Sequence, residues 1–253
     1  MTAPPRWPVV WIAGASTGIG RSLALQLAAK GCRVAVSARS REKLDALCAE
    51  QPRLSAYPLD VTDAAAVAET IAVVERDLGP IDLAILAAGA WTPMTIDTLS
   101  ADVFRDTNAV NYLGVTNAVS ILAPLMARRG KGHLAWIASV AGYVGLPKAY
   151  AYGPTKAALI NLAESLAPEL ESKGVAVSVI NPGFVETPLT AKNDFPMPFL
   201  MSPDEAARRT IEGLEARQFE IAFPRRMVAL LKGLRQLPYP ALFAVLRRGV
   251  LKG

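Results

Sequence analysis

Three side chains in the middle of the chain, Ser139, Tyr152 and Lys156, are of types that could together move a proton. Tyr152 and Lys156 are four residues apart, so a helix through both would place the phenol and the ammonium on one face. A free tyrosine has a pKa of about 10, and a nearby cation favours its phenolate, which would suit Tyr152 to acid–base chemistry at neutral pH. Pro154 does not exclude this helix, because proline is tolerated in a first turn. Such pairs are also common on ordinary helix surfaces, and the spacing alone leaves that alternative open.

A glycine-rich turn near the N-terminus has the composition of a phosphate-binding loop. Residues 14–20 read Gly-Ala-Ser-Thr-Gly-Ile-Gly and follow a short apolar run. Gly14 would allow a tight turn, Gly18 a close approach of backbone to a pyrophosphate, and Gly20 close packing of a helix on a strand. The N-terminal amides of that helix would face the phosphates. The spacing differs from the commoner G-x-G-x-x-G, and a purely structural turn is the alternative.

Arg39 bears on which dinucleotide would bind, because it ends the second apolar run. In a dinucleotide-binding fold, an acidic side chain at this position favours the free 2′-hydroxyl of NAD, whereas a cation suits the 2′-phosphate of NADP. Arg41 and Lys43 add positive charge nearby. We therefore expect NADP(H) to be preferred over NAD(H), the alternative being an arginine that is simply solvated at a strand end.

Strand and helix signals alternate along the chain, and the elements they predict must position these residues. Short apolar runs bounded by Gly, Pro or polar residues predict strands at 9–13, 33–38, 55–59, 81–87, 133–139, 175–180 and 220–223. Apolar residues at threes and fours predict helices at 21–30, 41–50, 64–78, 101–129, 157–173 and 203–216. Parallel strands need crossovers, and these are right-handed. The sequence therefore predicts an α/β class fold: a doubly wound, seven-stranded parallel sheet, the Rossmann fold, with helices on both faces.

Length and composition fit one catalytic domain, which we place at residues 1–223. The chain has 253 residues, 52% of them hydrophobic, enough for a substantial core. No stretch approaches about 18 consecutive apolar residues and no secretory pattern opens the chain, so we expect a cytoplasmic protein. With two cysteines and one histidine, a Cys/His metal cluster is excluded by counting, and a Ser-His-Asp triad would depend on His133 alone. No metal site is expected. Cys32, Cys48 and His133 are interpreted as structural residues.

Further short motifs occur in order along the chain, and together with those above they resemble the short-chain dehydrogenase/reductase family. The similarity covers nearly all of residues 8–223. The motifs are the turn at 14–20, Asp60-Val61-Thr62, Ala88-Gly89, Asn111, Ser139, Tyr152 with Lys156, and residues 181–187, which read Asn-Pro-Gly-Phe-Val-Glu-Thr. Their joint occurrence is far more specific than any one of them.

The resemblance implies an oxidoreductase that transfers hydride between a nicotinamide and a carbonyl or secondary alcohol, the hydride chemistry belonging to the cofactor. Tyr152 would exchange the proton with the substrate oxygen, Ser139 would hold that oxygen, and Lys156 would bind the nicotinamide ribose and lower the pKa of Tyr152. Asn111 would position a relay water. Asp60 would contact adenine, Gly89 would line the ribose path, and Thr187 would help to fix the carboxamide. The cofactor-binding set is Gly14, Ser16, Thr17, Gly18, Ile19, Gly20, Arg39, Asp60, Val61, Gly89, Tyr152, Lys156 and Thr187.

The chain departs from the family pattern at three places. Ala13 replaces the usual threonine before the first glycine, Leu86 and Ala87 stand in place of two asparagines, and Pro154 replaces a small residue. We expect changed local hydrogen bonding rather than lost catalysis, because none of these removes a group that performs the reaction.

The substrate side is less well defined by the sequence. The resemblance places a variable substrate loop at about 188–202. Its apolar residues predict a pocket lid and a hydrophobic carbonyl or alcohol: Phe195, Met197, Phe199, Leu200 and Met201. Core packing against the tail is the alternative. Trp91 follows Gly89 and Ala90 in a predicted loop. It either lines the active-site cleft or is a loop residue without a role there, and both interpretations remain open.

Residues 224–253 form a basic, apolar tail. All 22 acidic residues lie at or before Glu220. Seven of the 27 basic residues lie beyond Glu220, which leaves 20 basic and 22 acidic residues in the rest of the chain. The main body is thus slightly acidic, which argues against nucleic-acid binding. As a helix, the tail would place Met227, Leu230, Leu231, Leu234 and Leu237 on one face, with a break at 238–240. Such a segment suits peripheral contact with an anionic membrane or a subunit interface, and both remain open.

Two function classes remain. The leading one is an NADP(H)-linked carbonyl reductase or alcohol dehydrogenase acting on a small molecule, and the resemblance implies a homo-dimer or tetramer. Its rival is a catalytically silent nucleotide-binding or interaction protein, because fold alone does not establish function. A sugar-nucleotide epimerase is disfavoured, since the chain has little room for an extra substrate domain.

Overall fold

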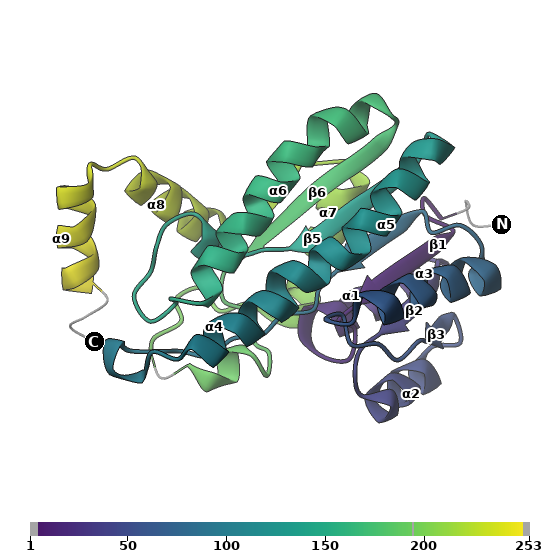
Figure 1. Ribbon diagram of the computed structural model, residues 1–253, viewed down its shortest axis with the longest axis horizontal. Coiled ribbons are helices and arrows are strands. Elements are labelled where there is room, and N and C mark those ends of the chain that lie inside the picture. The colour runs from purple at the N-terminus through teal and green to yellow at the C-terminus, as the bar shows by residue number, and fades with distance from the viewer. Residues whose placement is uncertain (1–4, 194, 250–253) are drawn as a thin grey trace.

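A seven-stranded, wholly parallel sheet forms the centre of the protein, with helices on both faces (Figure 1). The computed structural model describes residues 5–193 and 195–249. The strand order is β3-β2-β1-β4-β5-β6-β7. The strands are β1 (Val9–Ala13), β2 (Arg33–Ser37), β3 (Leu54–Ala56), β4 (Leu83–Leu86), β5 (Gly132–Ile137), β6 (Val175–Pro182) and β7 (Glu220–Phe223). The predicted Rossmann fold is confirmed.

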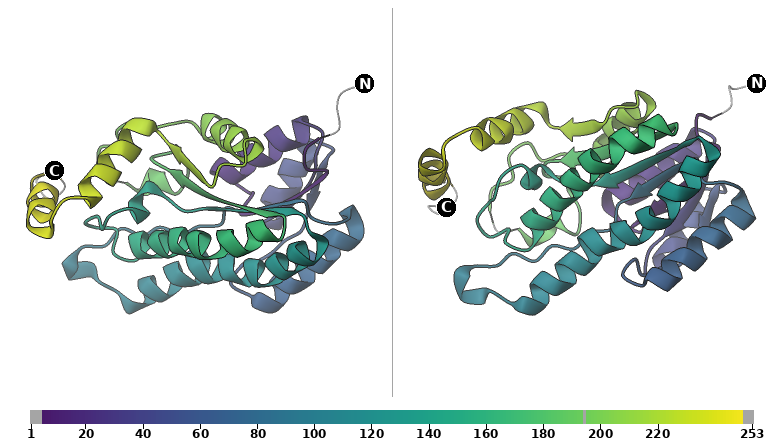
Figure 2. Two further views of the ribbon diagram at one scale, coloured as in Figure 1. Left: turned by 90° about the horizontal axis from the view of Figure 1, so that it is seen from above. Right: turned by 45° about the horizontal axis from the view of Figure 1, so that its top comes forward.

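Each face of the sheet has its own apolar cluster, as strands buried on both sides require. Helices α1 (Gly18–Ala29), α2 (Arg41–Glu50) and α7 (Pro203–Glu215) cover one face. Helices α3 (Ala64–Leu78), α5 (Gly114–Arg129) and α6 (Tyr152–Ser172) cover the other. Two further helices, α8 (Arg225–Arg235) and α9 (Tyr239–Gly249), extend from the body at the end toward which the strands point (Figure 2).

The single helix predicted for 101–129 is divided. It consists of α4 (Ala101–Asn108), a π-helical turn at η2 (Ala109–Leu113) and α5. Propensity and periodicity do not reveal a π turn, which adds one residue to a turn and rotates the rest of the helix about its axis. By length and composition, 101–129 is the one helix in the described part of the chain that could cross a membrane. However, Leu122 and Met126 of this helix are buried in the core cluster.

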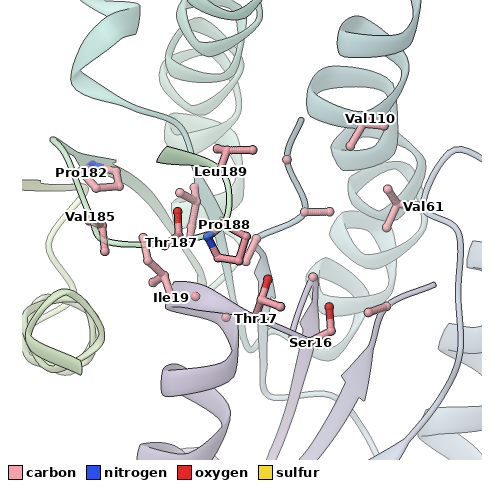
Figure 3. A pocket seen from close by; sticks show the side chains of 18 of the residues that line it. Ser16, Thr17, Ile19, Val61, Val110, Pro182, Val185, Thr187, Pro188 and Leu189 are labelled. Carbon is pink, nitrogen blue, oxygen red and sulfur yellow. The ribbon is translucent and has the colours of Figure 1, made fainter. Parts of the chain in front are cut away.

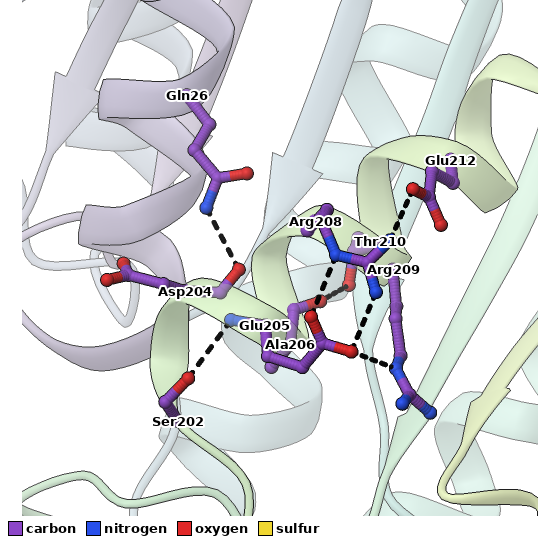
Figure 4. A network of polar contacts seen from close by, with 9 residues as sticks. All are labelled: Gln26, Ser202, Asp204, Glu205, Ala206, Arg208, Arg209, Thr210 and Glu212. Atoms are coloured by element: carbon purple, nitrogen blue, oxygen red, sulfur yellow. Dashed lines mark hydrogen bonds and ion pairs between the residues drawn. The ribbon is translucent and has the colours of Figure 1, made fainter.

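The start of α7 fixes the end of the loop at 188–202 against α1 (Figure 4). Ser202 caps α7 by accepting a hydrogen bond from the Glu205 backbone at 3.2 Å. From α1, Gln26 donates to the Asp204 carbonyl at 2.9 Å and Ser22 donates to the Asp204 carboxylate at 2.5 Å. The loop therefore ends at a point that is tied to the glycine-turn helix.

The tail helices pack on the body through some of their apolar residues and leave others exposed. Met227 and Leu231 of α8 and Leu242 of α9 are buried with Val140 and Val144. Leu230 and Leu237 are exposed, so the apolar residues predicted for one face of the tail divide between buried and exposed positions. The last residues of the predicted tail, 250–253, lie outside the described residues.

The one histidine of the sequence is structural, as expected, and two tryptophans within strands are structural as well. The Nε1 atoms of Trp11 and Trp136 donate to Ser37 Oγ at 3.0 Å and to the Leu159 carbonyl at 2.9 Å. His133 is buried, and its Nε2 lies 2.9 Å from Ser178 Oγ. Burial raises the pKa of both thiols, Cys32 and Cys48, which fits inert cysteines.

His133 is expected to make the protein sensitive to acid. Burial, with the positive charges of Arg217 and Arg6, lowers its pKa from 6.5 to about 4. Because the folded-state pKa lies below the unfolded one, the unfolded chain binds more protons between these values, and stability falls as pH drops through that window. A shift of this size corresponds to about 3 kcal/mol. Urea unfolding of the wild type and of His133→Gln at several pH values should therefore give a difference in unfolding free energy that changes by about that amount. A difference independent of pH would contradict this role.

Candidate active site

A cavity of about 520 Å³ lies where the strand order reverses, beyond the carboxyl ends of β1 and β4. Open parallel sheets bind ligands at such a switch point, and the volume is ordinary for a ligand site. Figure 3 shows Thr187, Pro188 and Leu189 of the segment after β6 beside Ile19 and Thr17 of the glycine turn. The lining includes nearly all the predicted cofactor and catalytic residues: Gly14, Ser16, Thr17, Gly18, Ile19, Gly20, Arg39, Asp60, Val61, Gly89, Ser139, Tyr152, Lys156 and Thr187.

The glycine turn leaves no room for side chains at its three glycines. Gly14 has a φ of +94°, and a Cβ there would lie 2.4 Å from the Ala88 backbone nitrogen. A Cβ on Gly20 would lie 2.2 Å from the Gly14 carbonyl oxygen, and one on Gly18 would lie 2.8 Å from Thr187 Cγ2. The Gly14 amide donates to the Ser37 carbonyl at 2.7 Å, which closes the turn onto β2. The turn therefore brings bare backbone to the cavity wall.

The N-terminus of α1 opens on this cavity. Thr17 occupies the N-cap position but its side chain makes no capping hydrogen bond. The first amides of a helix lack partners within the helix and carry partial positive charge, so they favour an anion. Residues 14–20 thus fit the pyrophosphate of a dinucleotide.

The cavity lining also holds two exposed cationic side chains. Arg39 and Lys43 both line the cavity, together with the carboxylate of Asp60. Hydrogen bonds from the backbone and side chain of Thr62 hold the pKa of Asp60 below its usual value, and the charge of Arg39 helps to lower it. Lys43 was noted in the sequence only as nearby charge. Its place in the lining follows from Ser40, which caps α2 by accepting from the Lys43 amide at 3.3 Å.

Tyr152 and Lys156 share one face of α6, because the helix begins at Tyr152 rather than at 157. Pro154 falls in its first turn, where it is tolerated. The Lys156 Nζ atom lies 5.3 Å from the Tyr152 ring centroid and donates to the Ile137 carbonyl at 2.8 Å. The loop after β5 brings Ser139 to the same wall, where Ser139 Oγ lies 3.4 Å from the Pro182 carbonyl.

The two ionisable groups have shifted pKa values, but not in the expected direction for the phenol. Burial raises the pKa of Tyr152 to about 12, and a hydrogen bond with Ser139 opposes the shift. Burial also lowers the pKa of Lys156 to about 7. The predicted lowering of the Tyr152 pKa by Lys156 is therefore not found. Burial penalises the charged forms of both side chains. At neutral pH, Tyr152 keeps its proton.

Trp91 lies against Tyr152 but is not among the residues that line the cavity. Its ring meets that of Tyr152 edge-on, with centroids 5.2 Å apart. Its Nε1 donates to Asn193 Oδ1 at 2.9 Å, which ties the strand-four loop to the substrate loop. A loop tryptophan after Ala88-Gly89 was the only sequence signal for this contact.

Asn111 lies behind the cavity wall, and the structure does not place it in the lining. The π turn directs its amide inward, where Oδ1 accepts from the Ala90 amide at 2.6 Å. Nδ2 donates to the Ala90 carbonyl and to Thr155 Oγ1, both at 3.1 Å. Asn111 thus holds the loop after Gly89 against α6, and its role toward a relay water stays a prediction.

The predicted apolar lid differs from the segment that lines the cavity. That segment is Pro188, Leu189 and Thr190. Phe195 instead packs on Phe184 with ring centroids 5.9 Å apart, Met201 forms a bridge with Val185, and Phe199 and Leu200 are exposed. The reason is local: Thr190 Oγ1 donates to the Val185 carbonyl at 2.6 Å and turns the chain back over the cavity. Asp194 of this loop lies outside the described residues.

Among residues 5–193 and 195–249, no group of three or more His, Cys, Asp or Glu side chains could hold a metal ion. The polar groups that face the cavity are hydroxyls, amides, Arg39, Lys43, Lys156 and the Asp60 carboxylate. This set suits phosphates and sugar hydroxyls.

Comparison with known proteins gives consistent relatives. A family model described as short chain dehydrogenase matches residues 8–196. An uncharacterized oxidoreductase of Myxococcus xanthus is 36% identical over 241 residues, 94% of this chain and 95% of that protein. A short-chain dehydrogenase structure from Streptomyces avermitilis superposes with a TM-score of 0.84 at 27% identity, over 99% of this chain and 100% of that one. A second structure, from Burkholderia phymatum in complex with NAD, has a TM-score of 0.82 at 23% identity, over 91% and 94% of the two chains.

Proposed function

Because the chain belongs to the short-chain dehydrogenase/reductase family and is an oxidoreductase of that family, we propose that it interconverts a hydrophobic carbonyl compound and its secondary alcohol using NADP(H). One observation carries the proposal: Ser139, Tyr152 and Lys156 line the same cavity as the glycine turn. A silent nucleotide-binding protein has no need of a buried phenol and ammonium in the dinucleotide cavity.

The cofactor would be held by the turn at 14–20, by Arg39 and Lys43 at its phosphorylated ribose, and by Lys156 and Thr187 at its other end. When bound, it supplies or accepts the hydride. Tyr152 gives its proton to the substrate oxygen during reduction, and Ser139 donates a hydrogen bond to that oxygen. The pKa of about 12 keeps Tyr152 protonated at neutral pH, and this is the form that can give a proton to the substrate oxygen.

Trp91 and Leu189 support a hydrophobic substrate. The ring of Trp91 meets that of Tyr152 edge-on, and Leu189 lines the cavity near Thr187. A carbonyl with an apolar substituent would bury that substituent there, and each buried methylene contributes about 0.8 kcal/mol.

Residues 1–223 form the catalytic unit in this proposal, and the protein works in the cytoplasm as a homo-dimer or tetramer.

The test is a screen of ketones of increasing hydrophobicity, with NADPH and with NADH. Turnover is measured from the absorbance of the reduced cofactor. Turnover that rises with chain length and prefers NADPH is expected. Tight NADPH binding with no turnover of any carbonyl or alcohol would overturn the proposed reaction.

Arg39 is expected to set the dinucleotide preference. Removing its charge in Arg39→Ser should lower kcat/KM for NADPH by about 10- to 100-fold, since a hydrogen bond to a charged group contributes about 1.5–3 kcal/mol. The value for NADH should change little. Arg41→Ser is the matched control, because Arg41 pairs with Asp45 at 3.1 Å outside the cavity lining. Equal effects of Arg39→Ser on the two cofactors would contradict the assignment.

A further inference from the structure

Exposed apolar side chains are concentrated in three short stretches. Among the described residues, the large apolar side chains with substantial exposure fall at 96–113, at 199–200 and at 230–245. Five of these eleven belong to the tail helices: Leu230, Leu237, Tyr239, Phe243 and Val245. Scattered exposed apolar residues need no explanation, but a gathered set marks a contact surface.

Helix α9 has an outer apolar side that packing on the body does not use. Leu242 points into the body and is buried. Tyr239 and Phe243, four residues apart, are 62% and 50% exposed, and their rings stack at 5.6 Å. Arg247 continues the same side one turn later. Helix α8 likewise leaves Leu230 61% exposed, although Leu231 beside it is buried.

The charge of this segment has one sign. The sequence contains no acidic residue after Glu220. Six basic side chains of α8 and α9 are exposed: Arg225, Arg226, Lys232, Arg235, Arg247 and Arg248. Lys232 forms an ion pair with Glu220 on the body. The exposed apolar residues of α8 and α9 therefore share these helices with exposed basic residues and with no acidic ones.

The tail helices lie at the end of the molecule that holds the cavity. Figures 1 and 2 place α8, α9 and the loop with η1 (Ile96–Thr98) at this end in every view. Helix α8 also reaches the cavity wall, because a Cβ on Gly183, which lines the cavity, would lie 2.7 Å from Met227 Sδ. A partner surface bound to α8 and α9 would therefore lie next to the cavity.

We propose that the tail face docks on an anionic lipid bilayer. The tail face comprises Leu230, Leu237, Tyr239, Phe243, Arg247 and Arg248. Amphipathic helices that lie in a membrane interface combine aromatic and aliphatic residues with a basic border, and long arginine side chains reach the headgroups. Contact between two tail faces would bring arginines together without a carboxylate, whereas acidic lipid headgroups complement them. This docking does not depend on the proposed reaction.

The experiment is vesicle flotation of the full chain, without substrate or dinucleotide. Vesicles of phosphatidylcholine alone are compared with an equal mixture of phosphatidylcholine and phosphatidylglycerol, at low and high salt. The charge variant is Arg247→Glu with Arg248→Glu, and the apolar variant is Tyr239→Ser with Phe243→Ser. The matched control is Arg33→Glu with Arg128→Glu, two exposed arginines at the start of β2 and near the end of α5. Circular dichroism and light scattering check the fold and the mass of each protein.

The wild type is expected to float with the anionic vesicles and to be released by salt. The charge variant should bind at least about 30-fold more weakly. The apolar variant should bind about 10-fold more weakly or worse, and the control should bind like the wild type. Absence of wild-type binding, equal binding to the uncharged vesicles, or equal weakening in the control would overturn the proposal. So would a fall in oligomeric mass in the tail variants with no lipid binding by the wild type, because the tail would then cover a second copy.

Discussion

Phenylalanine in place of Tyr152 is expected to lower kcat for carbonyl reduction by about a thousandfold, within the range of 10²–10⁴ for a lost general acid. The substitution removes only the hydroxyl. The ring that meets Trp91 edge-on and lies near Lys156 stays. Dinucleotide affinity should therefore change by no more than a few-fold, because the turn at 14–20 and Arg39 are untouched.

The measurement is single-turnover reduction of the best ketone from the screen, together with a fluorescence titration of NADPH. Tyr150→Phe is the matched control, since Tyr150 is half-buried two residues away and does not line the cavity. Retention of wild-type kcat by Tyr152→Phe would remove the tyrosine from the mechanism. Loss of NADPH binding in Tyr152→Phe would show that the effect is structural.

The sequence predicted well wherever a local rule decides the geometry. Glycines at 14, 18 and 20 act within one turn, and the four-residue spacing of Tyr152 and Lys156 acts within one helix. The parallel sheet follows from alternation, because short crossovers leave few topologies. For these parts, no contact between distant segments had to be known.

Other parts of the site depend on contacts between distant segments. The inward amide of Asn111 depends on a π turn and on Ala90 and Thr155, and the place of Trp91 depends on Asn193. The pKa of Tyr152 shows the same limit. The sequence identified the nearby cation, but the depth at which the fold buries both groups decides the direction of the shift.

Gly20 lies where helix α1 packs closely on the glycine turn, so a larger residue there is expected to have a large effect. Gly20→Ala should cost about 2–3 kcal/mol of unfolding free energy and weaken NADPH binding at least about 100-fold. Alanine is the better helix former, so propensity alone would stabilise the variant by up to about 1 kcal/mol. The added Cβ, however, would lie 2.2 Å from the Gly14 carbonyl oxygen and 3.0 Å from the Gly14 carbonyl carbon. That backbone is part of the turn proposed to hold the phosphates, and it cannot move aside as a flexible side chain can.

Gly233→Ala is the matched control, because it makes the same substitution inside helix α8, where an added Cβ meets nothing within 4 Å. It should leave NADPH binding unchanged and raise stability slightly, through helix propensity alone. Urea unfolding and NADPH titration of the two variants then separate the effect of the methyl group from the effect of its surroundings. If Gly20→Ala behaved like Gly233→Ala in both measurements, α1 would not need its close approach to the Gly14 backbone, and the glycine turn would lose its proposed role in placing the helix N-terminus at the phosphates.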